Sequence, residues 1–90
     1  MFVLNIHKKA QKAFEKAPLK IKKKVAICLN HLQQKGLLNL PYPIRVLKNW
    51  SRKHKYFEIK IDKDYRIVFR LEGNIFYIRL AGTHNALGTG

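Results

Sequence analysis

In the second half of the chain, apolar residues stand at every other position, and this alternation limits the choice of fold more than any other feature. It runs through Tyr56 to Asp62, Tyr65 to Leu71 and Ile75 to Leu80. The alternating apolar residues are Phe57, Ile59, Ile61, Ile67, Phe69, Leu71, Phe76, Ile78 and Leu80. A period of two residues is typical of strands that bury one face. Gly73–Asn74 suits a hairpin turn, because glycine accepts a positive φ without a steric penalty.

The first half of the chain has the residue spacing of helices. Phe2 to Ile6 is a short apolar run that predicts a strand. An amphipathic helix is expected from His7 onward, with its apolar stripe at Ala10, Ala13, Phe14 and Ala17. Pro18 ends this helix or starts the next, which we expect over about residues 18–35. Gly36 then follows the second helix as its terminating residue.

The remaining segments complete a small α+β fold. Residues 37–44 contain Pro41 and Pro43 and predict an extended connector, and Arg45 to Trp50 predict a strand. Ninety residues fill one core rather than two, so residues 1–90 are expected to form a single domain. The predicted order is β-α-α-β-β-β, with a small antiparallel sheet packed against a helical hairpin.

The charge of the chain is +14, from 19 Lys and Arg against five Asp and Glu. Residues 1–56 carry 14 of the basic residues and one acid, a net +13, which leaves +1 for residues 57–90. Self-repulsion of this size is best explained by a polyanionic partner, and nucleic acid is the first candidate. An anionic membrane is a weaker candidate, since the basic stretches lack a broad apolar face. A solvated surface that only keeps the protein soluble is the alternative.

Histidine and cysteine usage argues against a metal site. Cys28 is the only cysteine, which excludes an intramolecular disulfide and any multi-cysteine site. His7, His31 and His54 do not have metal-ligand spacing, and His31 lies beside core positions of the second helix. The opening apolar run is too short for a secretory signal, and no run approaches the ~18 apolar residues of a membrane span. We expect a cytoplasmic protein without metal or cofactor.

The alternation also places charged residues. If the apolar positions face the helices, then Glu58, Lys60, Arg66 and Arg70 face the other way, and Lys60 and Arg66 lie close together on neighbouring strands. The segment after the last strand delivers His84 to the rim of this face. Metal-free RNA cleavage requires such groups: the 2′-hydroxyl loses a proton, the phosphorane charge is stabilised, and the leaving 5′-oxygen gains a proton.

Other residues suit RNA binding without proving catalysis. The candidate RNA-binding cations are Lys48, Arg52, Lys53, Lys55, Arg70 and Arg79. The aromatic residues Trp50, Tyr56, Tyr65 and Tyr77 could stack on bases, although strand aromatics are more often part of a core. Glu58 and Asp64 could act as bases, but surface carboxylates usually have no chemical role. The residues alone therefore predict a basic sheet that binds RNA.

Two stretches resemble the RelE/ParE toxin superfamily. The strands YFEIKIDKDYRIVFRLEGNIFYI resemble the central strands of that family, where Tyr-Arg and two apolar residues follow a basic strand. The ending RLAGTHNALG is similar to the close of the YafQ branch, where a G-T-H-x-x-L segment carries the catalytic histidine. The predicted element order and the chain length agree with this resemblance.

The resemblance implies a toxin of a toxin–antitoxin pair that enters the ribosomal A site and cuts mRNA without a metal, leaving a 2′,3′-cyclic phosphate. It implies that His84 is the general acid and that Arg66 stabilises the transition state. Lys60 would contact the scissile phosphate or deprotonate the 2′-hydroxyl, and Asp64 falls at a functional aspartate of the YafQ branch. That branch has a histidine at the position of Lys60 and an aromatic residue at the position of Gly88, so Lys60, Glu58 and Asp64 all remain candidate bases.

Two other functions are compatible with the sequence. A ParE-like gyrase inhibitor has the same fold, and fold alone does not decide function. A non-catalytic RNA-binding module also fits the composition. The combination of Lys60, Arg66 and His84 favours the ribonuclease, with mRNA, the ribosome and its rRNA, and a cognate antitoxin as partners and no membrane.

Overall fold

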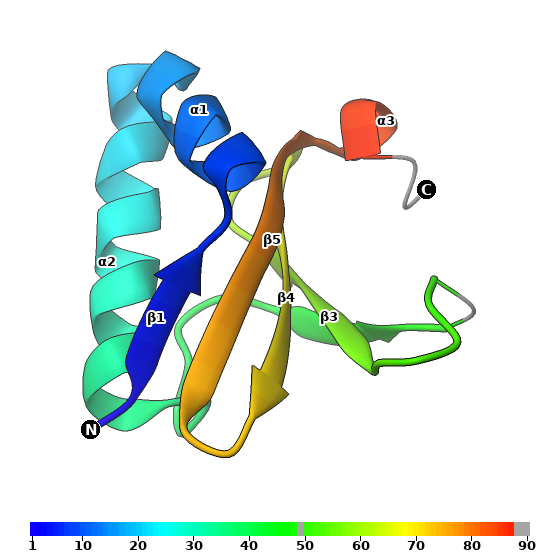
Figure 1. Cartoon of the computed structure of the whole chain (residues 1–90). Coiled ribbons are helices and arrows are strands. Elements are labelled where there is room, and N and C mark those ends of the chain that lie inside the picture. The colour runs from blue at the N-terminus through cyan, green and yellow to red at the C-terminus, as the bar shows by residue number, and fades with distance from the viewer. Residues whose placement is uncertain (49, 88–90) are drawn as a thin grey trace.

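The computed structural model describes residues 1–48 and 50–87, including the backbone but not the side chains of His84 and Asn85. Its elements in chain order are β1 (Val3–Ile6), α1 (Lys8–Lys16), α2 (Leu19–Lys35), β2 (Ile44–Leu47), β3 (Tyr56–Lys60), β4 (Tyr65–Glu72), β5 (Ile75–Thr83) and α3 (His84–Leu87). Helices α1 and α2 lie together on one side of the sheet, and α3 follows the end of β5 (Figure 1). The predicted α+β class is confirmed.

The sheet has five strands in the order β1-β5-β4-β3-β2. β1 pairs parallel to β5, and the other neighbouring pairs are antiparallel. The predicted antiparallel pairing does not hold for β1, and the summary order β-α-α-β-β-β counts one strand fewer than the four that follow the helices. Periodicity identifies a strand but not its neighbour, so it could not show that β1 pairs with the last strand. The strand predicted over residues 45–50 forms, but as the edge strand Ile44–Leu47.

One face of the sheet packs on α1 and α2 to form the core. The buried residues of this core are Ala10, Phe14, Ala17, Val25, Cys28, Leu32, Ile59, Ile61, Tyr65, Ile67, Phe69, Phe76, Ile78 and Ala81. The predicted stripe of the first helix is confirmed, and α2 buries Val25, Cys28 and Leu32 on the same side of the sheet. Burial raises the pKa of Cys28 to about 12, so its thiol stays protonated. Every helix in residues 1–48 and 50–87 is too short or too polar to cross a bilayer.

A β-bulge interrupts the pairing of β4 with β5. Val68 pairs with Leu80, whereas the next residue, Phe69, pairs with Ile78. Arg79 is therefore an extra residue on β5 and has no partner on β4. Such an extra residue bends a strand and changes the direction in which its side chains point.

The bulge corrects the sequence-based assignment of faces on β5. The alternation placed Leu80 on the core face together with Phe76 and Ile78, and this was wrong. Because Arg79 is inserted, Leu80 shares the face of its partner on β4, and Ala81 takes the core position instead. Arg79 itself lies on the face that points away from the helices, where it lines a pocket with Arg70 and Tyr77.

Gly36 ends α2 with a φ of +65°, and a Cβ atom there would lie 2.6 Å from the ring of Phe2. Gly73, in the β4–β5 turn, has a φ of +57° but no atom within 4 Å of such a Cβ. We expect Gly73→Ala to lower the free energy of unfolding by about 1 kcal/mol through backbone strain alone. Gly36→Ala should cost about 2 kcal/mol, since the ring must also move. Urea unfolding measures both, and equal losses would contradict the contact with Phe2.

Candidate functional site

Lys60 and Arg66 lie directly opposite each other on β3 and β4. They share the face of the sheet that points away from α1 and α2, which we call the outer face. Side chains of directly opposed residues are near neighbours in an antiparallel pair, so the predicted proximity of the two cations is confirmed. Lys60 is exposed, and Arg66 is mostly buried with 12% of its side chain accessible.

The guanidinium of Arg66 is held by the turn between β3 and β4. Its Nη1 donates to the backbone oxygens of Asp62, at 3.0 Å, and of Lys63, at 3.2 Å. Its Nε lies 3.6 Å from Oε1 of Glu58. The planar guanidinium therefore has a defined orientation, while Nη2 makes no hydrogen bond within the described part of the chain.

Glu58 is the buried acid of the outer face, with only 3% of its side chain exposed. The Nε of Arg45 donates to its Oε1 at 2.9 Å, and Arg66 approaches the same oxygen. The other oxygen, Oε2, is buried without a hydrogen-bond partner among the described residues. Glu58 is on the predicted face, but it is a buried ion-pair partner and not a surface carboxylate. This geometry suits a residue that orients arginines.

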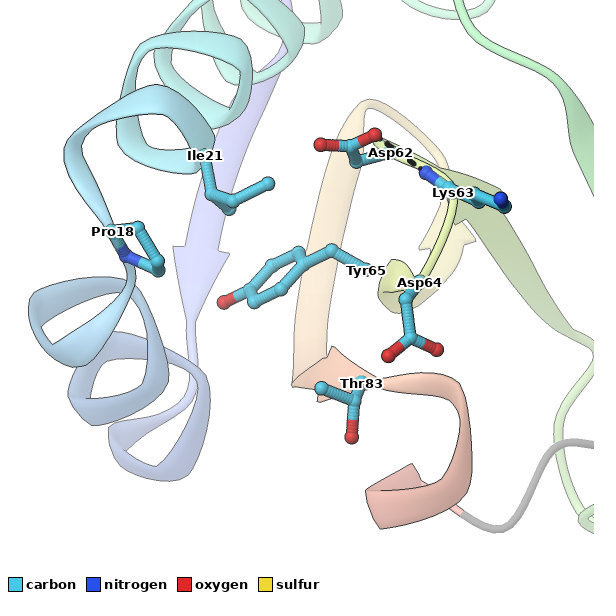
Figure 2. A pocket seen from close by; sticks show the side chains of 7 residues that line it. All are labelled: Pro18, Ile21, Asp62, Lys63, Asp64, Tyr65 and Thr83. Atoms are coloured by element: carbon cyan, nitrogen blue, oxygen red, sulfur yellow. Dashed lines mark hydrogen bonds between the residues drawn. The ribbon is translucent and has the colours of Figure 1, made fainter.

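Asp64 lies in the β3–β4 turn and is exposed. It lines a pocket of about 270 Å³ together with Pro18, Ile21, Tyr65 and Thr83, and its carboxylate and the Thr83 side chain lie at one side of that pocket (Figure 2). The Tyr65 hydroxyl is buried there without a hydrogen-bond partner among the described residues, and burial raises its pKa.

Neighbouring Asp62 fixes the turn. The backbone N–H of Lys63 donates to Oδ1 of Asp62 at 2.6 Å, and Nζ of Lys24 lies 3.5 Å from Oδ2 (Figure 2 shows the first contact). The backbone hydrogen bond is the main cause that lowers the pKa of Asp62, and the charge of Lys24 adds to it. Asp62 therefore stays ionised and ties the turn that holds Arg66 to helix α2.

The backbone at His84 lies at the same end of the sheet as the Lys60–Arg66 pair. Arg66 pairs with Gly82, and Thr83 ends β5 directly before His84 begins α3. The His84 side chain lies outside the described residues, and so does Gly88. The structure therefore places the position of the histidine but does not test the direction of its imidazole.

The predicted RNA-binding cations fall into two groups. Lys48, Arg52, Lys53 and Lys55 are exposed on the segment between β2 and β3. Arg70 and Arg79 are half-buried on the outer face, where Arg70 stacks 4.0 Å over the Tyr77 ring. Tyr56 lines a pocket with Arg70 and Arg79, and it packs edge-on against Trp50 at 4.7 Å between ring centroids.

Sequence reasoning missed Arg45, whose contact with Glu58 bridges β2 and β3. The sequence does contain a signal for this contact. When residues 44–47 are aligned antiparallel to β3, the basic Arg45 stands opposite the acidic Glu58. Among the described side chains, no three of His, Cys, Asp and Glu are grouped so that they could hold a metal ion.

No protein-family model matches the sequence, and no curated protein matches it either. Solved structures do match. YafQ from E. coli strain BL21(DE3) is 16% identical with a TM-score of 0.78, over 97% of this chain and 98% of that chain. A chain of the RelB–RelE antitoxin–toxin complex from Methanococcus jannaschii is 20% identical with a TM-score of 0.77, over 93% and 94%. The chain has the fold of the RelE-type toxins.

A third RelE-like structure supports the same fold. The YoeB dimer from Staphylococcus aureus is 20% identical with a TM-score of 0.74, over 92% of this chain and 97% of that chain. The near-complete coverage on both sides means that the RelE-type fold accounts for the helical hairpin as well as the sheet. The resemblance drawn from residues 56–88 is confirmed at the level of fold.

Proposed function

We propose that this protein is the toxin of a toxin–antitoxin pair and that it cleaves mRNA in the ribosomal A site without a metal ion. Its fold matches chains from structures described as the RelB–RelE antitoxin–toxin complex and the DinJ–YafQ toxin–antitoxin complex. The net charge of +14 supports a polyanionic substrate. An acidic or amphipathic antitoxin is the proposed protein partner, since its charge complements this surface.

The direct opposition of Lys60 and Arg66 carries the proposal. Two cations at one point of a sheet suit the two non-bridging oxygens of a phosphodiester. In the proposed reaction the 2′-oxygen forms a bond to phosphorus and the bond from phosphorus to the 5′-oxygen breaks. A base takes the 2′-hydroxyl proton, and an acid supplies a proton to the 5′-oxygen. The products are a 2′,3′-cyclic phosphate and a free 5′-hydroxyl.

We assign roles by what each side chain contacts. Arg66, oriented by the turn and by Glu58, stabilises the phosphorane charge. For His84 the assignment rests on the resemblance and on its backbone position at the same end of the sheet, and it serves as the general acid. Lys60, as a cation, contacts the scissile phosphate, and Asp64 is then the candidate base, since it is exposed in the adjoining turn. Glu58 is a positioning residue, because its buried oxygen contacts Arg45 and Arg66.

Primer extension on cellular messengers tests the proposal directly. Expression of the chain should arrest growth and produce cuts in frame with codons. Lys60→Ala should abolish the cuts, by removing a charge beside the scissile phosphate. Lys63→Ala is the matched control, because Lys63 is an exposed lysine in the adjoining turn and should leave cleavage within about twofold.

Two results would contradict the proposal in different ways. Intact messengers together with broken chromosomal DNA would indicate a gyrase inhibitor. In-frame cuts that persist at wild-type level in a folded Lys60→Ala protein would show that the site lies elsewhere.

A further inference from the structure

A second pocket lies on the outer face, at the opposite end of β4 from the Lys60–Arg66 pair. Its volume is about 260 Å³, and its lining includes His7, His54, Tyr56, Arg70, Tyr77 and Arg79. These residues come from β3, β4, β5, the start of α1 and the segment that precedes β3. No aspartate or glutamate of the described residues lines the pocket. Its lining is therefore cationic and aromatic, which suits an anion.

Arg79 lines this pocket and has a buried hydrogen-bond donor that no described residue satisfies. The bulge inserts it into β5 and leaves it without a partner residue on β4. Its Nη1 is buried and has no hydrogen-bond partner in residues 1–48 and 50–87. A buried guanidinium N–H without an acceptor is costly, so the geometry calls for an acceptor that enters the pocket.

Arg70 has an acidic neighbour that Arg79 lacks, although its Nη1 also has no acceptor with hydrogen-bond geometry among the described residues. Its Nη1 lies 2.6 Å from Oε1 of Glu72, a contact that raises the pKa of Arg70 and lowers that of Glu72. Nδ1 of His54 lies 3.7 Å from the same oxygen. Glu72 therefore neutralises Arg70 beside His54, whereas Arg79 has no ion pair with a described acidic residue.

His7 contributes from the start of α1. The backbone N–H of His7 donates to the Ile78 oxygen at 2.8 Å, which holds the residue against β5. Its Nδ1 accepts a hydrogen bond from the Lys9 N–H at 3.1 Å. The neutral ring then carries its proton on Nε2, so this nitrogen is a donor for an anion.

We propose that this pocket binds a phosphate of single-stranded RNA, other than the phosphate at Lys60 and Arg66. The inference rests on the proposed function for its choice of polymer. Arg66 and Arg70 are four residues apart on β4, or about 13 Å at strand spacing, so one strand of RNA along β4 reaches both places. Tyr56 and Trp50 lie beside the pocket and offer ring surfaces for a base.

The test uses the full chain and a single-stranded RNA oligonucleotide with methylated 2′-hydroxyls, which cannot be cut. Fluorescence anisotropy at several salt concentrations gives the affinity and its salt dependence. Arg79→Gln should weaken binding roughly tenfold to a hundredfold, the effect of losing a charged hydrogen bond. The slope of log K against log salt should become shallower by about 0.7, the value for one phosphate of a single strand.

Two further variants make the result specific. Lys23→Gln removes the same charge from an exposed position on α2 and should change the affinity less than about twofold. Arg79→Lys keeps the charge but loses the planar fork, so it should weaken binding several-fold with an unchanged salt slope. Arg79→Lys also serves as the test if Arg79→Gln does not fold.

Titration with inorganic phosphate separates a general anion site from an RNA site. Ring-proton resonances of His7 and His54 should shift with phosphate in the wild type and not in Arg79→Gln. Equal oligonucleotide affinity for the wild type and Arg79→Gln would overturn the inference. This holds whether or not phosphate shifts the histidine resonances. Because the oligonucleotide is not cut, a positive result stands even if messenger cleavage fails.

Discussion

Replacing Arg66 with alanine is expected to slow messenger cleavage by about 10²–10³-fold, the effect of removing one oriented donor from a developing oxyanion. The turn oxygens of Asp62 and Lys63 fix Nη1, and Glu58 lies near Nε, so the guanidinium is oriented before substrate binds. A group that does not reorganise during the reaction stabilises the transition state most effectively. Single-turnover cleavage of messenger on programmed ribosomes measures the effect.

The same substitution also removes contacts that hold the β3–β4 turn, so stability must be measured beside the rate. Cleavage is compared well below the melting temperature of the variant, with Arg52→Ala as the matched control, because Arg52 is exposed and distant in sequence from the turn. We expect Arg52→Ala to change cleavage by less than tenfold, through binding alone. Wild-type cleavage by a folded Arg66→Ala protein would show that Arg66 is only structural.

Glu58→Gln is expected to lower the free energy of unfolding by about 3 kcal/mol, at the low end for breaking a buried ion pair. The amide keeps the volume of the side chain but removes the charge that faces Arg45 and Arg66. The low end applies because the Arg45 side chain is 54% exposed and water can solvate it, whereas Arg66 is mostly buried. Guanidinium unfolding at neutral pH measures the loss.

Glu72→Gln is the matched control for this prediction. Glu72 also pairs with an arginine of the same sheet, but its side chain is 52% exposed. Exposed pairs contribute little, so Glu72→Gln should lose far less stability than Glu58→Gln. If both variants lose the same stability, burial of Glu58 does not strengthen its ion pairs. Glu58→Gln should also slow cleavage, since it loosens the orientation of Arg66.

The strands were predictable because side chains in a strand alternate between two faces. That rule correctly put Lys60 beside Arg66 and placed Ile59 and Ile67 in the core. It failed at Leu80, because the residue inserted by the bulge moves the later side chains of β5 to the opposite face. The sequence before the bulge gives no sign of this insertion. It also could not show that β1 pairs with β5, because pairing depends on tertiary structure.

The sequence predicted where along the strands the candidate site lies, but not how deeply its side chains are buried. Alternation gives the face on which Glu58 lies, yet its burial depends on Arg45 from the edge strand and on Arg66. His7 and His54 have no sequence spacing that links them, and only the parallel β1–β5 pair brings the start of α1 to this face. Their shared pocket is a product of the fold.

The pairing of β1 with β5 also determines when the sheet can finish folding during synthesis. Val3 pairs with Ile75, so the two partners are 72 residues apart (75 − 3). While the chain is being translated, the first strand has no edge to join until β5 has emerged. Closing so long a loop is slow compared with local helix formation. A product truncated before Ile75 leaves β1 unpaired, and only a ribosome that has read past the codons of β5 releases a chain able to finish its sheet.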